Sequence, residues 1–334
     1  MLDSDTETQA PQVEASQEIL QKFEVEETKT VTTPAPVAVP VKKETTNKKV
    51  EKALQNAEKS VNNGKAATAA TPITPPEKPA SKIPADYPPE VAAISKTAEA
   101  TWKKYKPQHL TGQKSYLDIH YLGMTVGKIM ITNKGLKTIN GKEVWHFHAR
   151  FKSAPFYSSI YELDDTVDTY VAKENFLSVR YSLIQRESKQ NVDDLQLFDR
   201  DALKTMWFYK MVRPDKTKVK NEEHPLPAFS SDPFSVLFLF QGLPLKDGDH
   251  YEIPIINKGK ILILKSDVEG REVIDTELGK KKAVRLHAVT KYSGDHLKSG
   301  DMTFWFSDDE NKTLLKASAK IKIGSVTADV VDAK

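Results

Sequence analysis

The sequence predicts a mainly β protein in which one large antiparallel sheet curves into a barrel or half-barrel around a single short apolar helix. Residues 113–231 and 250–332 alternate between apolar and polar side chains in short runs, as strands with one buried face do. No helical pattern separates these runs, which favours antiparallel pairing. Residues 231–245, between the two blocks, form the one strongly apolar run that is typical of a helix.

Residues 1–88 are predicted to be a disordered tail and linker. Up to residue 98 the chain holds 11 of its 19 prolines, 1 of its 14 glycines and only two aromatic residues, Phe23 and Tyr87. A segment with so few large apolar groups cannot offset its chain entropy by burial. The run at 71–84 is rich in proline and predicts a stiff spacer.

Residues 89–108 are predicted to form an amphipathic helix packed on the outside of the sheet. It follows Pro88 and Pro89, and its apolar face recurs at steps of three and four residues. The face consists of Val91, Ile94, Ala98, Trp102 and Tyr105. The rest of the chain, 110–334, is predicted to be a single β-rich domain with ample apolar residues for one core.

The strands of this domain are predicted from alternation and turn signals, and Asn140-Gly141 is the strongest hairpin turn. Residues 155–163 predict a short helix or turn, and residues 213–229 predict a polar loop leading to the central helix. The predicted strands lie near 114–131, 136–139, 143–151, 165–172, 176–188, 192–199, 203–210, 250–257, 260–269, 282–292, 301–307, 313–321 and 325–331.

The central helix has clear start and stop signals. Asp232 can cap its amino end, Pro233 suits the first helical position, and Gly242 with Pro244 supplies the stop. Because its side chains are apolar almost all round, the helix must be enclosed. It either plugs the sheet as core or lines a cavity for an acyl chain or another apolar ligand. The candidate cavity residues are Phe234, Leu237, Phe238 and Trp305.

Composition excludes several classes of function. The first 98 residues carry 12 Lys against 14 acidic groups, so the rest carries 49 − 12 = 37 basic and 46 − 14 = 32 acidic groups, too balanced for a nucleic-acid surface. The absence of cysteine excludes disulfides, thiolate metal sites and cysteine catalysis. No run approaches the ~20 apolar residues of a membrane span. The acidic start shows no signal peptide, which leaves open either a leader missing from this sequence or a cytoplasmic protein.

His146 and His148 form the sharpest chemical pattern. Residues two apart on a strand point to the same face, so both imidazoles could reach one metal ion. A third ligand would be required, and His120 on a neighbouring strand is the candidate. The alternative is a solvent-facing strand surface with Trp145, Phe147 and Phe151 filling the opposite side, and we expect no metal.

Three acidic clusters are candidates for acid–base chemistry or calcium binding. Each lies where a strand begins or turns, and acidic residues are ordinary in turns. The chain has no nucleophile elbow and no phosphate-binding glycine loop. We therefore expect no catalytic residues, no cofactor and no enzyme activity. The clusters are Asp164-Asp165 with Asp168, Asp193-Asp194, and Asp308-Asp309-Glu310.

Several short motifs, taken in order, resemble the bacterial domain-of-unknown-function family 3108 over about residues 112–332. This resemblance implies an all-β protein of the periplasm or cell envelope with no established activity, and a plan similar to the half-barrel of lipoprotein carriers at the level of fold. The motifs are Gly123-Met-Thr-Val-Gly127-Lys-Ile, Phe198-Asp199, Gly242-Leu-Pro-Leu-Lys-Asp-Gly-Asp249, Ile274-Asp-Thr-Glu-Leu-Gly279, Trp305-Phe-Ser-Asp-Asp309 and Lys320-Ile-Lys-Ile-Gly-Ser-Val-Thr-Ala-Asp-Val330.

These observations predict a non-catalytic envelope or periplasmic protein that binds an apolar ligand or lipid moiety. The alternative is a protein-interaction or structural module tethered by its disordered tail, docking on an envelope partner. A second alternative is a metal-dependent hydrolase that uses His146, His148 and nearby acids.

Overall fold

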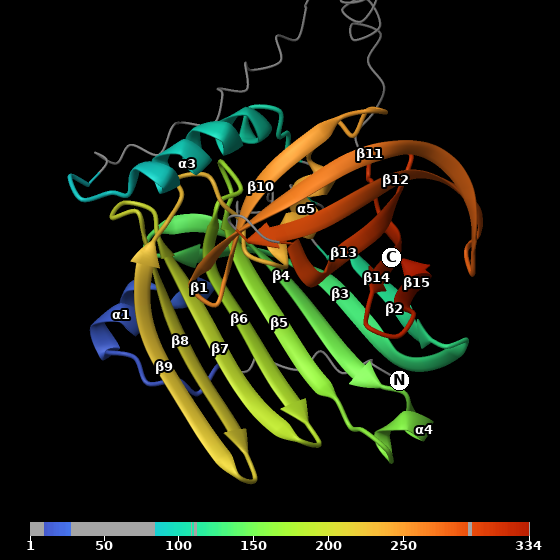
Figure 1. Ribbon diagram of the computed structural model, residues 1–334, viewed down its shortest axis with the longest axis horizontal. Helices are drawn as coiled ribbons and strands as arrows, with labels where there is room; N and C mark the ends of the chain where they lie inside the picture. The colour runs from blue at the N-terminus through green and yellow to red at the C-terminus, as the bar shows by residue number, and fades with distance from the viewer. Residues whose placement is uncertain (1–9, 28–83, 108, 110–111, 293–295, 334) are drawn as a thin grey trace, which may run out of the picture. The chain divides into compact units, whose positions relative to one another are not determined.

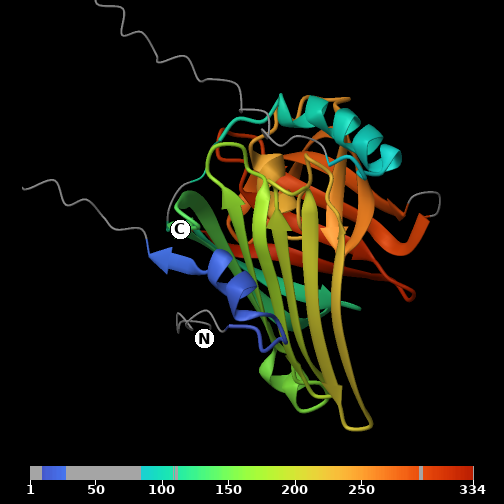
Figure 2. The same ribbon diagram turned by 90° about the vertical axis from the view of Figure 1, so that its left-hand side faces the viewer.

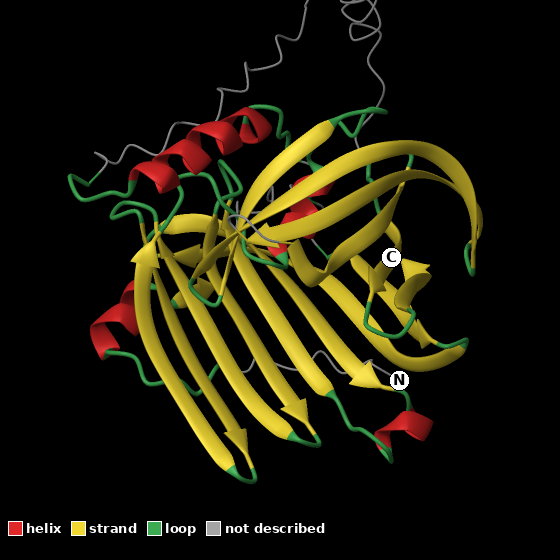
Figure 3. Cartoon of the chain, in the orientation of Figure 1, coloured by secondary structure: helices red, strands yellow, loops and turns green. Residues whose placement is uncertain are grey.

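The computed structural model describes residues 10–27, 84–107, 109, 112–292 and 296–333, which belong to one compact unit. Within them, fifteen strands form a single antiparallel sheet that curves strongly (Figures 1 and 3). The mainly β, antiparallel fold is thus confirmed. The strands are β1 (Val25–Glu27), β2 (Lys114–Tyr121), β3 (Met124–Ile139), β4 (Lys142–Ser153), β5 (Asp164–Ala172), β6 (Ser178–Glu187), β7 (Gln190–Asp199), β8 (Lys204–Arg213), β9 (Lys216–Pro225), β10 (His250–Asn257), β11 (Lys260–Thr276), β12 (Gly279–Tyr292), β13 (His296–Ser307), β14 (Leu314–Lys320) and β15 (Ser325–Ala333).

The first and last strands of residues 114–333, β2 and β15, pair with each other in the interior of the sheet. β15 pairs with β2, with Ala328 opposite Ile119, and hairpin neighbours extend from this pair in both directions. The two edges are therefore β9 and β10. Because β9 and β10 are not paired, the described sheet is curved and open rather than a closed barrel.

Another part of the chain covers the β10 edge of the sheet. The loop after β9 runs beside β10, where the Ser231 N–H donates to the Pro254 carbonyl at 2.9 Å and the Ser231 carbonyl accepts from the Ile256 N–H at 2.9 Å. Helix α3 (Pro89–Trp102) lies across this end of the sheet (Figure 2). The Ser95 hydroxyl on α3 accepts from the Ala228 N–H at 3.0 Å. The β10 edge is thereby protected from pairing with other chains.

Helix α5 (Ser235–Gln241) occupies the concave side of the sheet, as the apolar run predicts. The Asp232 carboxylate accepts from the backbone N–H groups of Phe234 at 2.9 Å and Ser235 at 2.8 Å, so it holds the turn that leads into the helix, whereas the N-cap position itself is Phe234. The helix itself begins two residues after Pro233. Its buried residues are Ser235, Val236, Phe238, Leu239 and Phe240. The remaining helices are α1 (Gln17–Lys22) and α4 (Pro155–Ser158).

The sequence prediction is wrong for residues 216–225, which form β9 instead of part of a loop. β9 is an edge strand that pairs only with β8, and most of its side chains are exposed. A strand without a buried face needs no alternation of apolar residues. The ladder of hydrogen bonds to β8 therefore forms this strand without a local apolar signal.

The structure also corrects part of the predicted disordered tail, because residues 10–27 are ordered on the sheet. Ser16 caps α1 through its hydroxyl, and β1 pairs with β3 with Val25 opposite Ile139. β2 ends its pairing with β3 at Thr132, and β1 uses the stretch of β3 beyond that point. The apolar partners of this segment come from the sheet, so its own composition does not reveal them. Residues 28–83, which hold the predicted spacer, lie outside the described residues.

Within the described ranges, the longest and most apolar helices fall short of what is needed to cross a membrane.

Candidate functional site

The two faces of β4 are used differently. Its odd-numbered residues face α5 on the inner face, where the Phe147 ring stacks on the Phe238 ring with centroids 3.9 Å apart. Its even-numbered residues face the opposite side, called here the outer face, where the His146 ring stacks on the Tyr170 ring at 4.3 Å. Residues 10–27 cover this outer face (Figure 2). Both histidines at even positions are buried, and His146 lies beside this segment.

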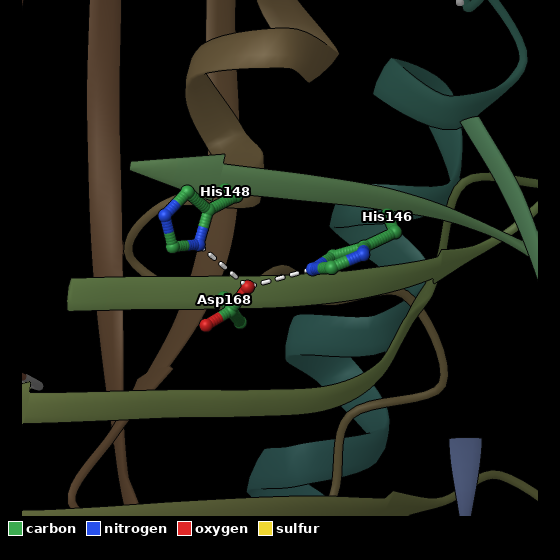
Figure 4. Close-up of side chains that lie close together, drawn as sticks. All are labelled: His146, His148 and Asp168. Atoms are coloured by element: carbon green, nitrogen blue, oxygen red, sulfur yellow. Dashed lines mark hydrogen bonds and ion pairs between the residues drawn. The ribbon is translucent and has the colours of Figure 1, made fainter. Parts of the chain in front are cut away.

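His146, His148 and Asp168 converge on the outer face (Figure 4). His148 lies directly opposite Asp168 in the register of β4 and β5. Asp168 Oδ1 accepts from His146 Nε2 at 2.6 Å and from His148 Nδ1 at 2.9 Å. All three side chains are almost fully buried, with residue exposures of 1–2%. Together they form what we call the histidine–aspartate cluster.

The environment of the cluster sets its charge. Burial lowers the pKa of His146, although the neighbouring Asp168 carboxylate pulls in the opposite direction. Burial acts to raise the pKa of Asp168, but the hydrogen bonds and charges of His146 and His148 outweigh it and hold the pKa at about 2. Asp168 is therefore an ionised acceptor at neutral pH, and His146 is a neutral donor.

The cluster is not a closed hydrogen-bond network. Among the described residues, the outward nitrogens His146 Nδ1 and His148 Nε2 have no partner, although both atoms are buried. The Thr132 hydroxyl is also buried without a partner, and Thr132 lies opposite His148 on β3. An unpaired buried polar atom costs on the order of 1–3 kcal/mol. Three such atoms beside one carboxylate mark the cluster as incomplete.

A bulge in β3 shapes the surroundings of the cluster. The register with β4 shifts between Asn133 and Gly135, so Lys134 is an extra residue on β3. Gly135 has φ +86°, a left-handed conformation that glycine adopts without strain, and the Asn133 side chain accepts from its N–H at 2.9 Å. The bulge changes the phase of β3, so Thr132 and Lys137 both fall on the outer face.

A groove of about 630 Å³ lies between residues 10–27 and the outer face, and we call it the outer groove. His146 is part of its wall, so the histidine–aspartate cluster borders the groove. Arg180 on β6 also lines it and donates one hydrogen bond, from Nη1 to the Phe23 carbonyl at 3.1 Å. Within the described residues, Arg180 forms no ion pair at contact distance. The lining residues that matter here are Leu20, Val25, His146, Tyr170, Arg180 and Leu195.

The structure brings together three of the four residues predicted to line an apolar cavity. Leu237 and Phe238 border a hollow of about 20 Å³, enough for about one water molecule. Phe234 meets Phe238 edge-on, with ring centroids 5.2 Å apart. Trp305 does not join them, because alternation along β13 turns it away from α5. Its indole Nε1 donates instead to Glu272 Oε1 at 2.6 Å.

His120 is not the third partner of the histidine pair. It lies on β2 beside Thr125 and Asp329, and Asp168 occupies the position that we predicted for it. The predicted alternative, a solvent-facing pair, is also wrong, because His146 and His148 are both buried. The signal available in the sequence was Asp168 itself, which pairing of two adjacent strands can place opposite His148.

Most of the other acids shape turns or form ordinary ion pairs. The Arg150 guanidinium donates to both oxygens of Asp164 at 2.7 Å, and Arg186 donates to Asp193 at 2.9 Å. Asp309 Oδ1 accepts from the backbone N–H groups of Asn311 and Lys312, which closes the turn between β13 and β14. Only Asp168 among these acids lies in the histidine–aspartate cluster. Sequence reasoning missed Arg180 and Tyr170, because their role depends on lining the outer groove, which is visible only in the folded structure.

Comparison with known proteins gives a family but no function. A family model described as a protein of unknown function, DUF3108, matches residues 117–331. No curated protein matches the chain.

Solved structures match the chain at low sequence identity. A β-barrel-like protein of DUF1849 from Brucella abortus is 11% identical, with a TM-score of 0.45, and 68% of this chain and 98% of that chain are covered. LprF from Mycobacterium bovis is 12% identical, with a TM-score of 0.20 and coverages of 74% and 94%. These similarities are too distant to bear on function.

Proposed function

Because this chain belongs to the DUF3108 family, whose function is unknown, we propose its function from its geometry: it is a non-catalytic binding protein of the bacterial cell envelope, and its ligand is an amphipathic acid in the outer groove. The observation that carries this proposal is a half-buried Arg180 facing a groove of about 630 Å³. That volume lies within the range of small-molecule sites.

The groove combines an apolar wall with a cation, which suits a molecule that has an acyl chain and an acidic head. Leu20, Val25 and Leu195 supply apolar surface, and Arg180 supplies the charge. A guanidinium has five N–H donors, and the structure shows one hydrogen bond from Arg180. Its remaining donors suit a carboxylate or phosphate, which guanidinium groups bind through two parallel hydrogen bonds.

The volume of the outer groove also favours a ligand there rather than beside α5. The hollow at Leu237 and Phe238 holds about one water, whereas the outer groove is roughly the size of a lipid chain.

The envelope assignment rests on the family resemblance and on the absence of cysteine, which suits a compartment where free thiols are avoided.

The test uses the full chain purified without detergent. Mass spectrometry of its lipid extract should show a bound acid, and a fluorescent fatty acid should bind and be displaced by palmitate. The Arg180→Gln variant should bind the probe at least tenfold more weakly, whereas Arg285→Gln should bind normally. Arg285 is the matched control because it pairs with Glu269 on β11, outside the groove. Equal binding by all three proteins would contradict the proposal.

A second candidate function, docking on a membrane surface, is favoured by an apolar rim of three neighbouring turns. Five large apolar side chains on these turns are 49–75% exposed. The turns touch one another: the Tyr157 hydroxyl donates to Met124 Sδ at 3.9 Å, and the Tyr121 hydroxyl donates to the Ile323 carbonyl at 3.2 Å. The rim consists of Leu122, Met124, Phe156, Ile160 and Ile323.

A lipid surface fits this rim because the exposed side chains project from separate turns. Tyr121 and Tyr157 flank them, and Lys322 lies exposed between Ile321 and Ile323. Tyrosine and lysine beside exposed apolar residues are typical of proteins at the membrane interface. Contiguous exposed apolar surface on a monomer marks an interaction site.

Sedimentation with vesicles of phosphatidylethanolamine and phosphatidylglycerol tests the rim. The wild-type chain should pellet with the vesicles, and the double variant Phe156→Asp with Ile323→Asp should remain in the supernatant. Val273→Asp, at a position 60% exposed on β11, is the control and should pellet. A wild-type chain that binds no vesicles would exclude a lipid surface and leave the rim to a protein partner.

A further inference from the structure

The histidine–aspartate cluster has the composition of a metal centre. His146, His148 and Asp168 each offer one ligand atom, and these atoms lie within 4.8 Å of one another. The strands β4 and β5 hold the three side chains, which is a more rigid support than a loop. Two imidazoles and one carboxylate form the set that zinc and other first-row divalent metals use when a further coordination position stays open.

The unsatisfied atoms distinguish this cluster from an ordinary buried ion pair. The outward nitrogens of both histidines and the Thr132 hydroxyl lack partners in the described part of the chain. A metal-bound histidine normally donates its other ring N–H to a nearby oxygen. Thr132 lies in the same cross-strand row as His148 and its hydroxyl has no partner, so this hydroxyl is the candidate for that oxygen.

We propose that His146, His148 and Asp168 bind one first-row divalent cation, with zinc as the reference metal, at the wall of the outer groove. His146 borders the groove, which gives the ion a path from solvent and leaves an open coordination side. Mg²⁺ and Ca²⁺ are disfavoured because they prefer sets made entirely of oxygen.

Binding of the cation changes where the imidazole protons lie but not their number. In the metal-free protein, His146 Nε2 and His148 Nδ1 each carry a proton donated to Asp168. When these nitrogens coordinate the ion, each proton moves to the other ring nitrogen of the same residue. The two hydrogen bonds are replaced by metal–ligand bonds, and no net proton is released. This site does not depend on the ligand of the outer groove.

The experiment is a zinc titration of the full chain, prepared without a metal-affinity step and treated with a chelator. Calorimetry should show one zinc per chain, and Co²⁺ should produce the visible bands of a low-coordination site. Asp168→Asn, which keeps the shape of the side chain but is a poor ligand, should weaken zinc binding at least tenfold. His148→Ala should do the same, whereas His287→Ala, which removes a half-exposed histidine paired with Asp301, should not.

Circular dichroism melts without metal separate lost binding from lost folding. If His148→Ala is unfolded, the folded Asp168→Asn variant decides the outcome. Zinc binding that survives unchanged in Asp168→Asn would overturn the proposal, and so would a wild-type chain that binds no zinc. The same holds if His287→Ala is the variant that loses the ion. Arg180→Gln should lose the fatty-acid probe and still bind one zinc per chain, so the failure of groove binding is distinguishable from the failure of this site.

Discussion

The ring of Phe147 on β4 lies flat against the ring of Phe238 on α5, with centroids 3.9 Å apart and 16° between their planes. Phe147 is 1% exposed and Phe238 is 6% exposed. This contact joins the inner face of the sheet to the helix that the sheet surrounds. The same strand presents His146 and His148 to the other side. β4 thus connects the apolar core with the candidate site.

Replacing Phe238 with alanine should destabilise the protein by about 3–4 kcal/mol, because it removes a buried ring and leaves a cavity beside Phe147. Urea unfolding followed by fluorescence measures the change. Phe156→Ala is the control, since Phe156 is 75% exposed and its loss should change stability by less than about 0.5 kcal/mol. Phe238→Asp should unfold the domain. Equal effects of the two alanine variants would show that α5 is not core.

Gly242→Ala should destabilise the protein by about 1–3 kcal/mol for a steric reason. A Cβ at this position would lie 2.2 Å from the Tyr105 ring and 2.8 Å from the Lys106 carbonyl oxygen. Thermal unfolding of the single variants and of the double variant Gly242→Ala with Tyr105→Leu checks the cause. The double variant should lose less stability than the sum of the two single changes, because the smaller side chain makes room. Strict additivity would contradict the clash.

Stability should depend on pH through His109. Burial lowers the pKa of His109 from its ordinary value of 6.5 to about 4. The unfolded chain therefore binds more protons between these values, so this contribution to stability is complete above pH 6.5 and is lost as the pH falls towards 4. The loss is about 3 kcal/mol. His109→Gln should lack this dependence in denaturant titrations at pH 7 and pH 4. If the His109→Gln variant lost as much stability between pH 7 and pH 4 as the wild type does, His109 would not be the cause.

Asp194 should change the stability with pH in the opposite direction to His109. Burial raises the pKa of Asp194 from 3.8 to about 6, although the Trp207 indole N–H donates to its Oδ1 at 2.9 Å. Because the folded pKa is the higher one, this contribution is present below pH 3.8 and is lost as the pH rises through 6. Asp194→Asn keeps the acceptor and removes the buried charge, so it should be more stable than wild type by about 1–3 kcal/mol at pH 7.5. The two proteins should unfold alike near pH 4. A variant that is less stable at both pH values would contradict this.

Local signals were sufficient for much of the fold. The period-2 alternation in β4, the Asn140-Gly141 turn and the hydrogen bonds of Asp232 ahead of α5 all act over a few residues, so they can be read without the tertiary structure. The same alternation placed His146 and His148 on one face. It did not decide whether that face meets solvent, because this depends on a segment more than a hundred residues away.

The sequence by itself determined that this protein is mainly β, that its apolar helix must be enclosed, and that two histidines share one strand face. Only the tertiary structure decided that Asp168 stands opposite His148, that residues 10–27 cover the outer face, and that β9 forms an edge. These features depend on strand register and on burial supplied by distant partners. Periodicity and caps are properties of a short window, whereas register and cover arise when distant segments pack together.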